Sequence, residues 1–600
     1  MIKNVRSPLR SAVPIADTWD LSKLFADDAA WELELKKLER RIGKHQQWQG
    51  HLGESAAQLA ACLKFSGGSE RLAERLGNYA YLRAAEDQAN ADYQRMLGRS
   101  RTVTTRLSEA TSYIQPELLA IPDAKLKRML QDPALALYRL KIERILRFRP
   151  YTLAAAEERL LAMQGDMAAT TNTVFRQLHD ADLKFGTVED EQERRIELSP
   201  ATFTQLLQSP AREVRKRAFH QFYDQFAAHG NTLAAILHGS IQKDVYYAKV
   251  RGYASCLESA LFPDQVTTAV YDNLIATVRR HLPTVYRFYE LRRRKMRLRK
   301  IHHYDTYVPI LSQIKQRHTW DQAVRVVTEA LAPLGENYVK VLRAGLAGRW
   351  CDRYPNQGKQ SGAFSYGTYD GEPYILMNYK PEVLNDVFTL AHEAGHSMHS
   401  HLSVQHQPYE YYHYTIFVAE VASTFNEQLL ARHLLENTRD ARMQAYLINN
   451  QIDDIRATIV RQTMFAEFEK TTHAMVEAGE PLTLAAFQQV YRRLLEDYFG
   501  PEFSLDEELS LECLRIPHFY RAFYVYKYAT GLSAAIALSE RVLRGGQPEL
   551  DDYLGFLQAG CSKFPLDLLR DAGVDLETPQ PVEAAMQKLA SLVDSLDQLL

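Results

Sequence analysis

Cysteine is scarce in this sequence of 600 residues. The five cysteines are odd in number, lie far apart and form no C-x-x-C pair; they are Cys62, Cys256, Cys351, Cys513 and Cys561. A disulfide framework and a cysteine-based zinc site both need cysteines at short, paired spacings. The sequence therefore excludes a disulfide-stapled secreted fold, and we expect reduced thiols in a cytoplasmic protein.

Long apolar segments are also absent. A membrane-spanning helix needs about 18 uninterrupted apolar residues, whereas the apolar run from Ala529 to Leu538 is short and is interrupted by Gly and Ser. The first residues, MIKNVRSPLRS, contain no apolar stretch like that of a secretory signal. We therefore expect neither export by that route nor a membrane partner.

An excess of charge of one sign is the third feature that the sequence lacks. Its net charge of −2 gives no overall reason to bind nucleic acid. A local exception is the run from Arg292 to Lys300, in which seven of nine residues are basic, a density also found in nucleic-acid sites. At an expected helix C-terminus these charges also complement the helix dipole. No nucleic-acid motif accompanies them, so we expect no such partner.

The length of the chain predicts two or more domains, because one hydrophobic core rarely organises so many residues. From about residue 26 to 183 the sequence is rich in Ala, Leu, Glu, Gln, Arg and Lys, with apolar residues three and four apart, as in a run of helices. A glycine turn, a charged run and a Ser-Pro helix start follow up to residue 200. We therefore predict an N-terminal helical domain (1–200) and a second domain (201–600).

Helical periodicity resumes in the second domain but fails between residues 353 and 379, where glycines separate short apolar runs. The segment Pro373–Tyr379 is the best strand candidate, because turn residues flank it on both sides. The predicted fold class is therefore mainly α, with a small β-sheet.

The chemistry of the sequence concentrates in an H-E-x-x-H pattern at His392, Glu393 and His396. On a helix, the two histidines lie about 40° apart around the axis and about 6 Å apart along it, so both imidazoles can reach one metal ion. Glu393 is turned about 100° from His392, which suits a general base acting on a metal-bound water. The spacing alone also fits two histidines that merely line a buried helical face.

A catalytic zinc usually takes three protein ligands, so a third ligand is needed. The residues after His396 lack the glycine and distal histidine of a metzincin, which excludes that class. His399 lies a further turn along the helix and fits packing or an outer hydrogen bond better than ligation. Glu420 and Glu427 follow on a second helical stretch, and the residues alone leave both as candidates.

Several segments resemble one known family. The stretch from Phe388 to His399 resembles the zinc helix of the thimet oligopeptidase superfamily and, within it, of oligopeptidase F, while Phe417–Thr424 is similar to the segment of its third ligand. The resemblance implies a zinc ligand set of His392, His396 and Glu420, with one Zn²⁺ per chain. It also implies a multi-helix, neurolysin-like architecture with a small sheet beside the zinc helix. A deep substrate channel would have residues 1–200 as its wall or lid.

The segment from Arg515 to Gly531 resembles the His- and Tyr-rich substrate segment of oligopeptidase F. Phenol and imidazole groups can stabilise the oxyanion that forms when an amide is attacked. We choose His518, Tyr524 and Tyr528 for this role, since the two tyrosines are four residues apart and would share a helical face. The alternates, which we assign to substrate binding, are Tyr520 and Tyr526. Such an aromatic stripe is also typical of core packing.

The resemblance further implies a glycine-bearing loop at Gly362 and an edge strand at Tyr374, along which an extended peptide pairs its backbone. Such pairing tolerates many sequences, because main-chain hydrogen bonds do not depend on the side chains. The predicted function is a zinc metalloendopeptidase that hydrolyses internal bonds of short unstructured peptides. The alternative is a zinc-stabilised peptide-binding protein without activity; Glu393 favours the enzyme, because structural zinc sites have four protein ligands and need no base.

Overall fold

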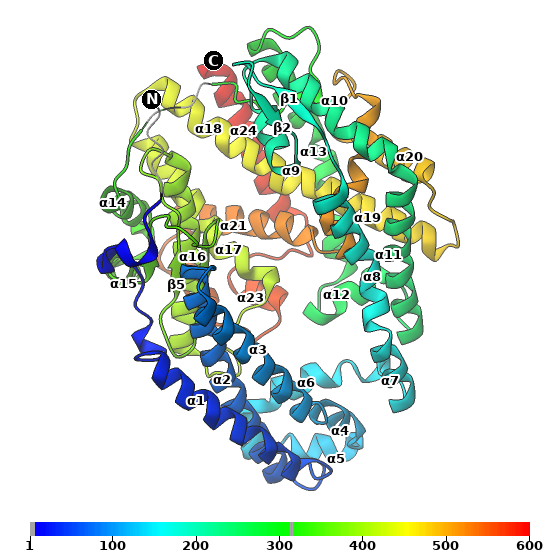
Figure 1. Cartoon of the computed structure of the whole chain (residues 1–600), viewed down its shortest axis with the longest axis vertical. Helices are drawn as coiled ribbons and strands as arrows, with labels where there is room; N and C mark the ends of the chain where they lie inside the picture. Colours follow the sequence, from blue (N-terminus) through cyan, green and yellow to red (C-terminus); the bar gives the residue numbers. More distant parts are fainter. Residues whose placement is uncertain (1–6, 312–313, 315) are drawn as a thin grey trace. The chain divides into compact units, whose positions relative to one another are not determined.

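The computed structural model describes residues 7–311, 314 and 316–600, and helices dominate it (Figure 1). The chain forms two compact units, each assembled from three segments. The first unit comprises residues 1–150, 315–433 and 538–573, and the second comprises 151–314, 434–537 and 574–600. The predicted boundary at residue 200 lies inside the second unit, at the start of a helix. The assignment of residues 1–200 to a channel wall stays a prediction.

The first unit contains twelve described α-helices and a three-stranded sheet. Its helices are α1 (Asp28–Ile42), α2 (Ala56–Glu86), α3 (Ala91–Thr111), α4 (Ile114–Ala120), α5 (Asp123–Met129), α6 (Arg139–Leu146), α14 (Trp320–Ala330), α15 (Glu336–Ala347), α16 (Leu384–His406), most of α17 (Ile416–Glu436), α22 (Gln547–Gln558) and α23 (Pro565–Asp571). Side chains of α1, α2 and α3 form one apolar core with residues before α1 and with β5.

The sheet of the first unit has the strand order β3-β5-β4, with β3 at Cys351–Asp352, β4 at Phe364–Tyr366 and β5 at Tyr374–Leu376. β5 runs parallel to β3 and antiparallel to β4. The predicted strand is therefore present, but it is the central strand and not the edge, and its residues 374 to 376 are fully buried. β4 has an open edge, because it pairs only with β5 in the described part of the chain.

Helix α16 carries the H-E-x-x-H pattern and packs against both β4 and β5, and against α14, α15 and α22. Figure 1 shows α16 beside β5. Small residues follow one another along it, which lets other elements approach closely. At Gly395 an added Cβ would lie only 2.5 Å from the Ala422 carbonyl oxygen and 2.6 Å from the Cα of Ser423. Glycine in the middle of the pattern therefore allows the backbone of α17 to touch α16.

The second unit is also mainly helical. It contains α7 (Ala155–Met163), α8 (Gly165–Gln177), α9 (Pro200–Leu207), α10 (Arg212–Ala228), α11 (Gly230–Arg251), α12 (Cys256–Leu261), α13 (Thr268–Lys295), α18 (Ala441–Ile455), α19 (Arg461–Glu477), α20 (Leu484–Phe499), part of α21 (Tyr526–Arg544) and α24 (Gln580–Leu599), with the hairpin strands β1 (Thr187–Glu189) and β2 (Arg195–Glu197). The prediction of a mainly α fold with a small sheet beside the motif helix is confirmed.

A buried charge network lies inside the second unit. The Glu512 carboxylate is fully buried and accepts hydrogen bonds from Arg461, from Arg515 (2.6 Å) and from the Tyr491 hydroxyl (2.7 Å). Burial alone would raise the pKa of Glu512, but the charges of Arg461 and Arg515 hold it well below its usual range. Charge pairing of this kind offsets the cost of removing the carboxylate from water.

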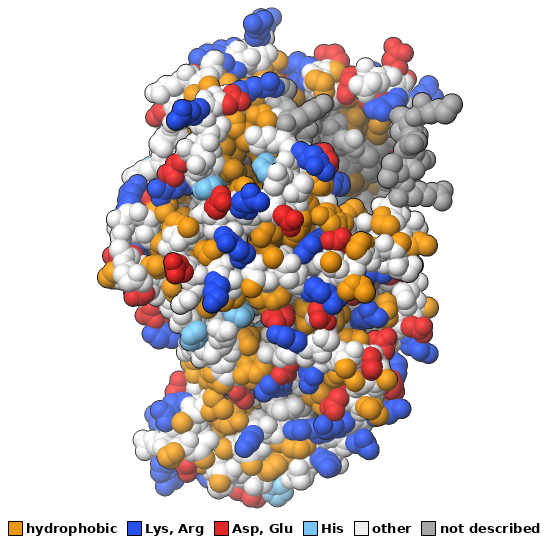
Figure 2. All heavy atoms as spheres, turned by 90° about the vertical axis from the view of Figure 1, so that its left-hand side faces the viewer, with side chains coloured by type: hydrophobic (Ala, Val, Ile, Leu, Met, Phe, Trp, Pro, Cys, Tyr) orange, Lys and Arg blue, Asp and Glu red, His pale blue; other side chains and the backbone are white. Residues whose placement is uncertain are grey.

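The basic run begins at the predicted helix end, since α13 ends at Lys295. Arg292 is 1% exposed and donates to two backbone carbonyls, while Arg293 pairs with Glu290 and Arg294 pairs with Asp597. These pairs all lie within the second unit. On the face drawn in Figure 2, Lys and Arg side chains are interspersed with Asp and Glu. Among the described residues, no helix is both long and apolar enough to span a membrane.

Candidate functional site

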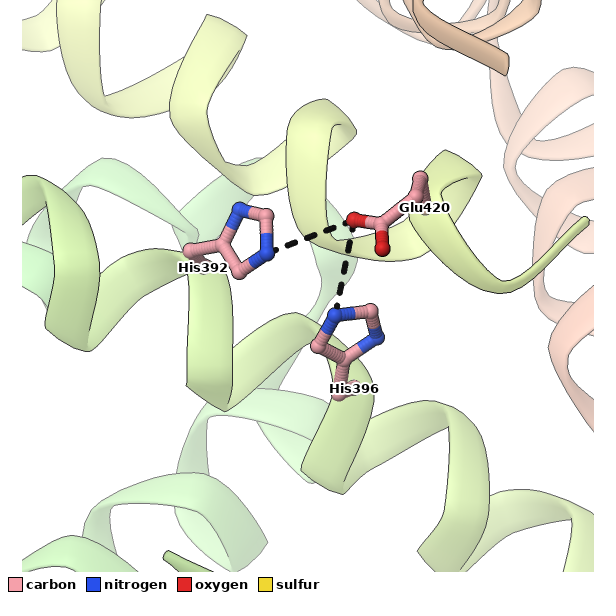
Figure 3. A group of neighbouring side chains, drawn as sticks. All are labelled: His392, His396 and Glu420. Carbon is pink, nitrogen blue, oxygen red and sulfur yellow. Dashed lines mark ion pairs between the residues drawn. The ribbon is translucent and has the colours of Figure 1, made fainter. Parts of the chain in front are cut away.

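The two motif histidines converge with Glu420 in the first unit (Figure 3). His392 and His396 project from α16, and Glu420 projects from the first turns of α17. Glu420 Oε2 lies 3.3 Å from His392 Nε2 and 3.6 Å from His396 Nε2. One ligand atom from each residue lies within 4.8 Å of the other two, close enough for a common ion. Three side chains that are separate in sequence therefore form one candidate metal site.

Glu427 occupies the outer side of His392. Its Oε1 accepts a hydrogen bond from His392 Nδ1 at 2.9 Å, and it is not part of the group that converges on one point. This contact orients the imidazole of His392, so that Nε2 is the ring nitrogen that faces Glu420. Of the two carboxylates that the residues alone left open, Glu420 takes the inner position and Glu427 the outer one.

The donor set fits a divalent metal ion. Two imidazoles and one carboxylate are the ligands of several catalytic zinc sites, which keep a fourth position for water or substrate. In the described part of the chain, Glu420 and Glu427 have ion pairs only with His392 and His396, not with Lys or Arg. Clustered carboxylates without a permanent cation need a compensating positive charge. A cation held by His392, His396 and Glu420 would supply that charge.

The pKa values of the site follow from burial and from this crowding. Burial would raise the pKa of Glu420, but its hydrogen bond with His392 and the charges of both histidines lower it to about 2. Burial lowers the pKa of His396 to about 4. For His392, burial acts downward, but Glu420 and Glu427 raise its pKa to about 10. The protein groups alone thus favour an ionised Glu420.

Glu393 lies beside the ligands and is 6% exposed. Burial raises the pKa of Glu393 to about 7, and the charge of Glu420 acts in the same direction. His392 and a backbone hydrogen bond from Ser365 on β4 act against this rise. A carboxylate with a pKa near neutrality can accept and return a proton at physiological pH.

Two hydrogen bonds position Glu420 and its helix. The Asn426 side-chain amide of α17 donates to the Ala391 carbonyl of α16 (3.1 Å), and within α17 the Ser423 hydroxyl donates to Glu420 Oε2 (3.1 Å). His399, which the sequence placed outside the ligand set, is buried and stacks on the Tyr414 ring at 3.7 Å between centroids. Burial lowers the pKa of His399 to about 3. His399 therefore belongs to the packing that supports the site.

Gly362 lies before β4 with a φ of +84°, a left-handed conformation that favours glycine. Its carbonyl accepts a hydrogen bond from Asn378 (2.9 Å). Tyr374 is fully buried in β5 and packs edge-on against Trp19. The expectation of an edge strand at Tyr374 was wrong, because β4 lies outside β5. Contact of Gly362 and Tyr374 with a substrate stays a prediction.

The predicted His/Tyr cluster is assembled in the second unit. The rings of His518, Tyr524 and Tyr528 lie 5.4 to 6.1 Å apart between centroids, and all three residues are half-buried. Burial lowers the pKa of His518. The guanidinium of Arg521, a residue that the sequence reasoning missed, lies 4.0 Å from the centre of the Tyr524 ring. That this cluster faces the metal ligands stays a prediction.

The spacing of Tyr524 and Tyr528 predicted that they share a helix. This prediction was wrong, because α21 begins only at Tyr526. The residue before Tyr524, Phe523, has a φ of +54°, which interrupts any helix there. The Phe523 N–H donates to the buried carboxylate of Glu469 on α19 (2.9 Å). Burial raises the pKa of Glu469 well above its usual range. No sequence pattern indicated this support, since Glu469 lies inside an ordinary helix.

The two alternate tyrosines differ from the cluster in burial. Tyr520 is 6% exposed and stacks on Phe175 at 4.3 Å between centroids. Tyr526 is 1% exposed and packs beside Tyr271. Both rings therefore contribute to the core of the second unit, and their contact with a substrate stays a prediction.

Comparisons with known proteins agree with each other. Residues 205–588 match the family described as Peptidase family M3, and residues 117–185 match the family described as Oligopeptidase F. The sequence is 41% identical to Oligopeptidase PepF of Bacillus subtilis, over 99% of this chain and 88% of that protein. It is 38% identical to the Oligoendopeptidase F homolog of Borreliella burgdorferi, over 96% of each chain.

Solved structures also match over nearly the whole chain. A crystal structure of a peptidase from Chlamydophila abortus has a TM-score of 0.93 and 33% identity, and covers 99% of this chain and 100% of its own. A crystal structure of oligoendopeptidase-F from Enterococcus faecium has a TM-score of 0.75 and 33% identity, and covers 95% of this chain and 99% of its own.

Proposed function

This chain belongs to peptidase family M3 and is a metallo-oligopeptidase, and we propose that it is a zinc metalloendopeptidase that hydrolyses internal bonds of short unstructured peptides. The observation that carries the proposal is the convergence of His392, His396 and Glu420, with Glu393 beside them. A structural zinc site would take four protein ligands, whereas three ligands leave a position for the reacting groups. Glu393, which lies beside the ligand set without belonging to it, then has a chemical role.

Zn²⁺ would be held by the Nε2 atoms of His392 and His396 and by the Glu420 carboxylate. When bound, the ion supplies a Lewis acid that polarises the scissile carbonyl and lowers the pKa of a water toward neutrality. Glu427 keeps the imidazole of His392 oriented by accepting its Nδ1–H. Second contacts of this kind typically change metal affinity by about 10- to 100-fold.

Glu393 acts as the general base. Its carboxylate takes a proton from the attacking water and delivers it to the nitrogen of the leaving amine, so that the C–N bond breaks without expelling an amide anion. The burial of Glu393 supports this role, because a carboxylate with a raised pKa accepts a proton more readily than an exposed one. Proton transfer of this kind contributes about 10²- to 10⁴-fold to the rate.

The open edge of β4 pairs with the backbone of the peptide. Ser365 in this strand lies against both Glu393 and the Ser397 hydroxyl of α16 (2.8 Å), so a peptide on this edge passes beside the proposed base. Main-chain pairing gives affinity without a requirement for particular side chains. His518, Tyr524 and Tyr528 are the proposed donors to the oxyanion that forms at the scissile carbonyl.

A quenched fluorescent peptide tests the function with and without a chelator. The wild type should cleave it, the chelator should stop cleavage and Zn²⁺ should restore it. Glu393→Gln should keep its zinc and lose about 10²- to 10⁴-fold in kcat. Glu382→Gln, in an exposed side chain just before α16, is the matched control and should act as the wild type.

Two outcomes would contradict the proposal. Equal turnover by Glu393→Gln and the wild type would remove the assigned base. Peptide binding without cleavage by the wild type, across a library of lengths and sequences, would favour the alternative of a non-catalytic peptide-binding protein.

A further inference from the structure

A groove lies between α2 and α3 in the first unit, and its chemistry is not used by the hydrolytic site. It has a volume of about 830 Å³ and is lined by side chains of both helices and by Tyr366 of β4. Binding pockets for small molecules typically have volumes of about 300–1,000 Å³. The groove is therefore large enough for a few residues of an extended chain.

The groove continues the open edge of β4. Tyr366 is the last residue of β4 and contributes to the groove wall, where its ring lies 5.0 Å from the ring of Tyr81 on α2. The preceding residue, Ser365, is the one whose backbone lies against Glu393. A peptide that pairs with β4 beside the proposed base therefore enters the groove when it passes Tyr366.

Asn78 on α2 is the strongest sign that the groove has a ligand. It lines the groove and is only 5% exposed, yet in the described part of the chain its side-chain amide makes no hydrogen bond. An amide that lines a groove without a protein partner is free to bond to a molecule in the groove. Both its donor and its acceptor match the groups of a peptide backbone.

The charge of the groove favours a cation. Glu70 and Glu74 line it from α2, while Arg101 of α3 is its one basic lining residue. Glu74 already accepts hydrogen bonds from the hydroxyls of Tyr409 and Tyr412. Glu70 accepts a hydrogen bond from Ser66 (2.9 Å) and forms an ion pair with Lys141 of α6 (3.5 Å), but its side chain is 41% exposed. The Glu74 side chain is 18% exposed, so Glu70 is the more accessible of the two carboxylates.

We propose that the α2–α3 groove binds the amino-terminal end of the peptide, with Asn78 bonded to its backbone and Glu70 paired with its free α-ammonium group. This inference rests on the proposed function, because it takes the occupant of the β4 edge to be a substrate peptide. In the proposed mode the peptide pairs antiparallel with β4, so its amino-terminal end lies beyond Tyr366, the last residue of β4, where the groove is. The direction of pairing and the charge of the groove agree.

The helix also sets a length. Asn78 and Glu70 are eight positions apart on α2, or about 12 Å at the helical rise. An extended peptide covers that distance in about three to four residues. Peptides with at least that many residues beyond the one bound at Asn78 should reach Glu70, and shorter ones should not.

Binding to Glu393→Gln, which holds peptides without cutting them, tests the groove directly. The probe is an octapeptide without Lys or Arg, labelled at its C-terminus, in free and N-acetylated forms, with anisotropy as the readout. The free form should bind about tenfold more tightly, the usual size of a hydrogen-bonded charge contact. Adding Glu70→Gln should abolish this preference. Adding Glu109→Gln, in an exposed glutamate of α3 outside the groove, should leave it intact.

Adding Asn78→Ala should weaken both forms of the peptide by a similar factor, because it removes a contact to the backbone. Unchanged thermal unfolding midpoints show that the variants are folded. Equal affinity for the free and acetylated peptides, or a preference that survives Glu70→Gln, would overturn the proposal. Cleavage by the wild type without any preference for a free amine would refute the groove and leave the proposed function standing. An affinity that depends on the free amine, without cleavage by the wild type, would refute the proposed function and leave the groove standing.

Discussion

Replacing Gly395 by alanine tests the view that α17 is positioned by its contact with α16. The new methyl group would lie 2.5 Å from the Ala422 carbonyl oxygen and 2.6 Å from the Cα of Ser423. Favourable contacts between such atoms lie near 3.5–4.0 Å, so the two backbones must separate by about 1 Å. Neither contacted atom can rotate away, because both belong to the main chain. Glu420 precedes Ala422 by two positions and moves with it.

Two opposing effects set the size of the loss. Alanine in a helix interior is favoured over glycine by about 0.5–1 kcal/mol, whereas overpacking costs about 1–3 kcal/mol. Since the clash is with main chain, we expect a net destabilisation of about 1–2 kcal/mol. The effect on metal binding should be larger. Ligand distances tolerate only about 0.2 Å, so a shift of about 1 Å in Glu420 should lower zinc affinity at least tenfold.

Zinc affinity is measured by competition with a chromophoric chelator, and stability by the urea midpoint of the metal-free protein. Gly555→Ala on α22 is the matched control, because it makes the same substitution in a helix of the same unit where an added Cβ meets nothing within 4 Å. That variant should bind zinc normally and be slightly more stable. If Gly395→Ala and Gly555→Ala behave alike, the close approach does not position Glu420.

Three further variants test other contacts. Glu427→Gln should weaken zinc binding about 10- to 100-fold while the fold stays intact, as measured by chelator competition and circular dichroism; unchanged affinity would contradict its role in orienting His392. Glu512 has a depressed pKa in the folded state, so its stabilisation is full above the pKa of the unfolded state, about 4.3, and is lost as the pH falls toward the folded value. The gap in urea midpoint between wild type and Glu512→Gln should therefore be wide at pH 7, where losing one partner of a buried pair costs about 3–5 kcal/mol, and should narrow by pH 3; a gap independent of pH would refute this. Glu469→Leu leaves the Phe523 N–H without an acceptor, at a cost of about 1–3 kcal/mol, and should lower kcat more than it raises KM, whereas Glu469→Gln keeps an acceptor and should retain most of kcat; equal losses in both would remove the hydrogen bond as the cause.

The sequence predicted those parts of the site that depend on local periodicity. His392 and His396 are one helical turn apart, so any helix through them brings both imidazoles to one side, and α16 does so. The mainly α class likewise followed from the spacing of apolar residues. Glu420 was a different case, because the residues alone could not separate it from Glu427. The choice depended on the family resemblance, and the geometry agrees with it.

Features that depend on tertiary structure could not be obtained in this way. The family resemblance implied an edge strand at Tyr374, but β5 is the central strand, and order along the chain does not reveal which strand lies outside it. Tyr524 has helical spacing to Tyr528, but Phe523, the residue before Tyr524, has a left-handed conformation. The buried carboxylate of Glu469 on α19 accepts a hydrogen bond from the Phe523 N–H and stabilises this conformation. Each unit consists of three segments, and the segments of the two units alternate along the sequence. No single boundary in the sequence therefore separates the units.

This interleaving determines when the metal site can be completed during synthesis. The ligands on α16 and α17 are synthesised close together in time. Helix α22, which packs against α16, comprises residues 547–558 and is therefore synthesised much later. Because chains emerge from the N-terminus, the nascent protein carries its ligands long before it has the helix that supports them. Metal loading into the finished site must wait for the C-terminal segment. A truncation far from the ligands in sequence would then remove part of their support.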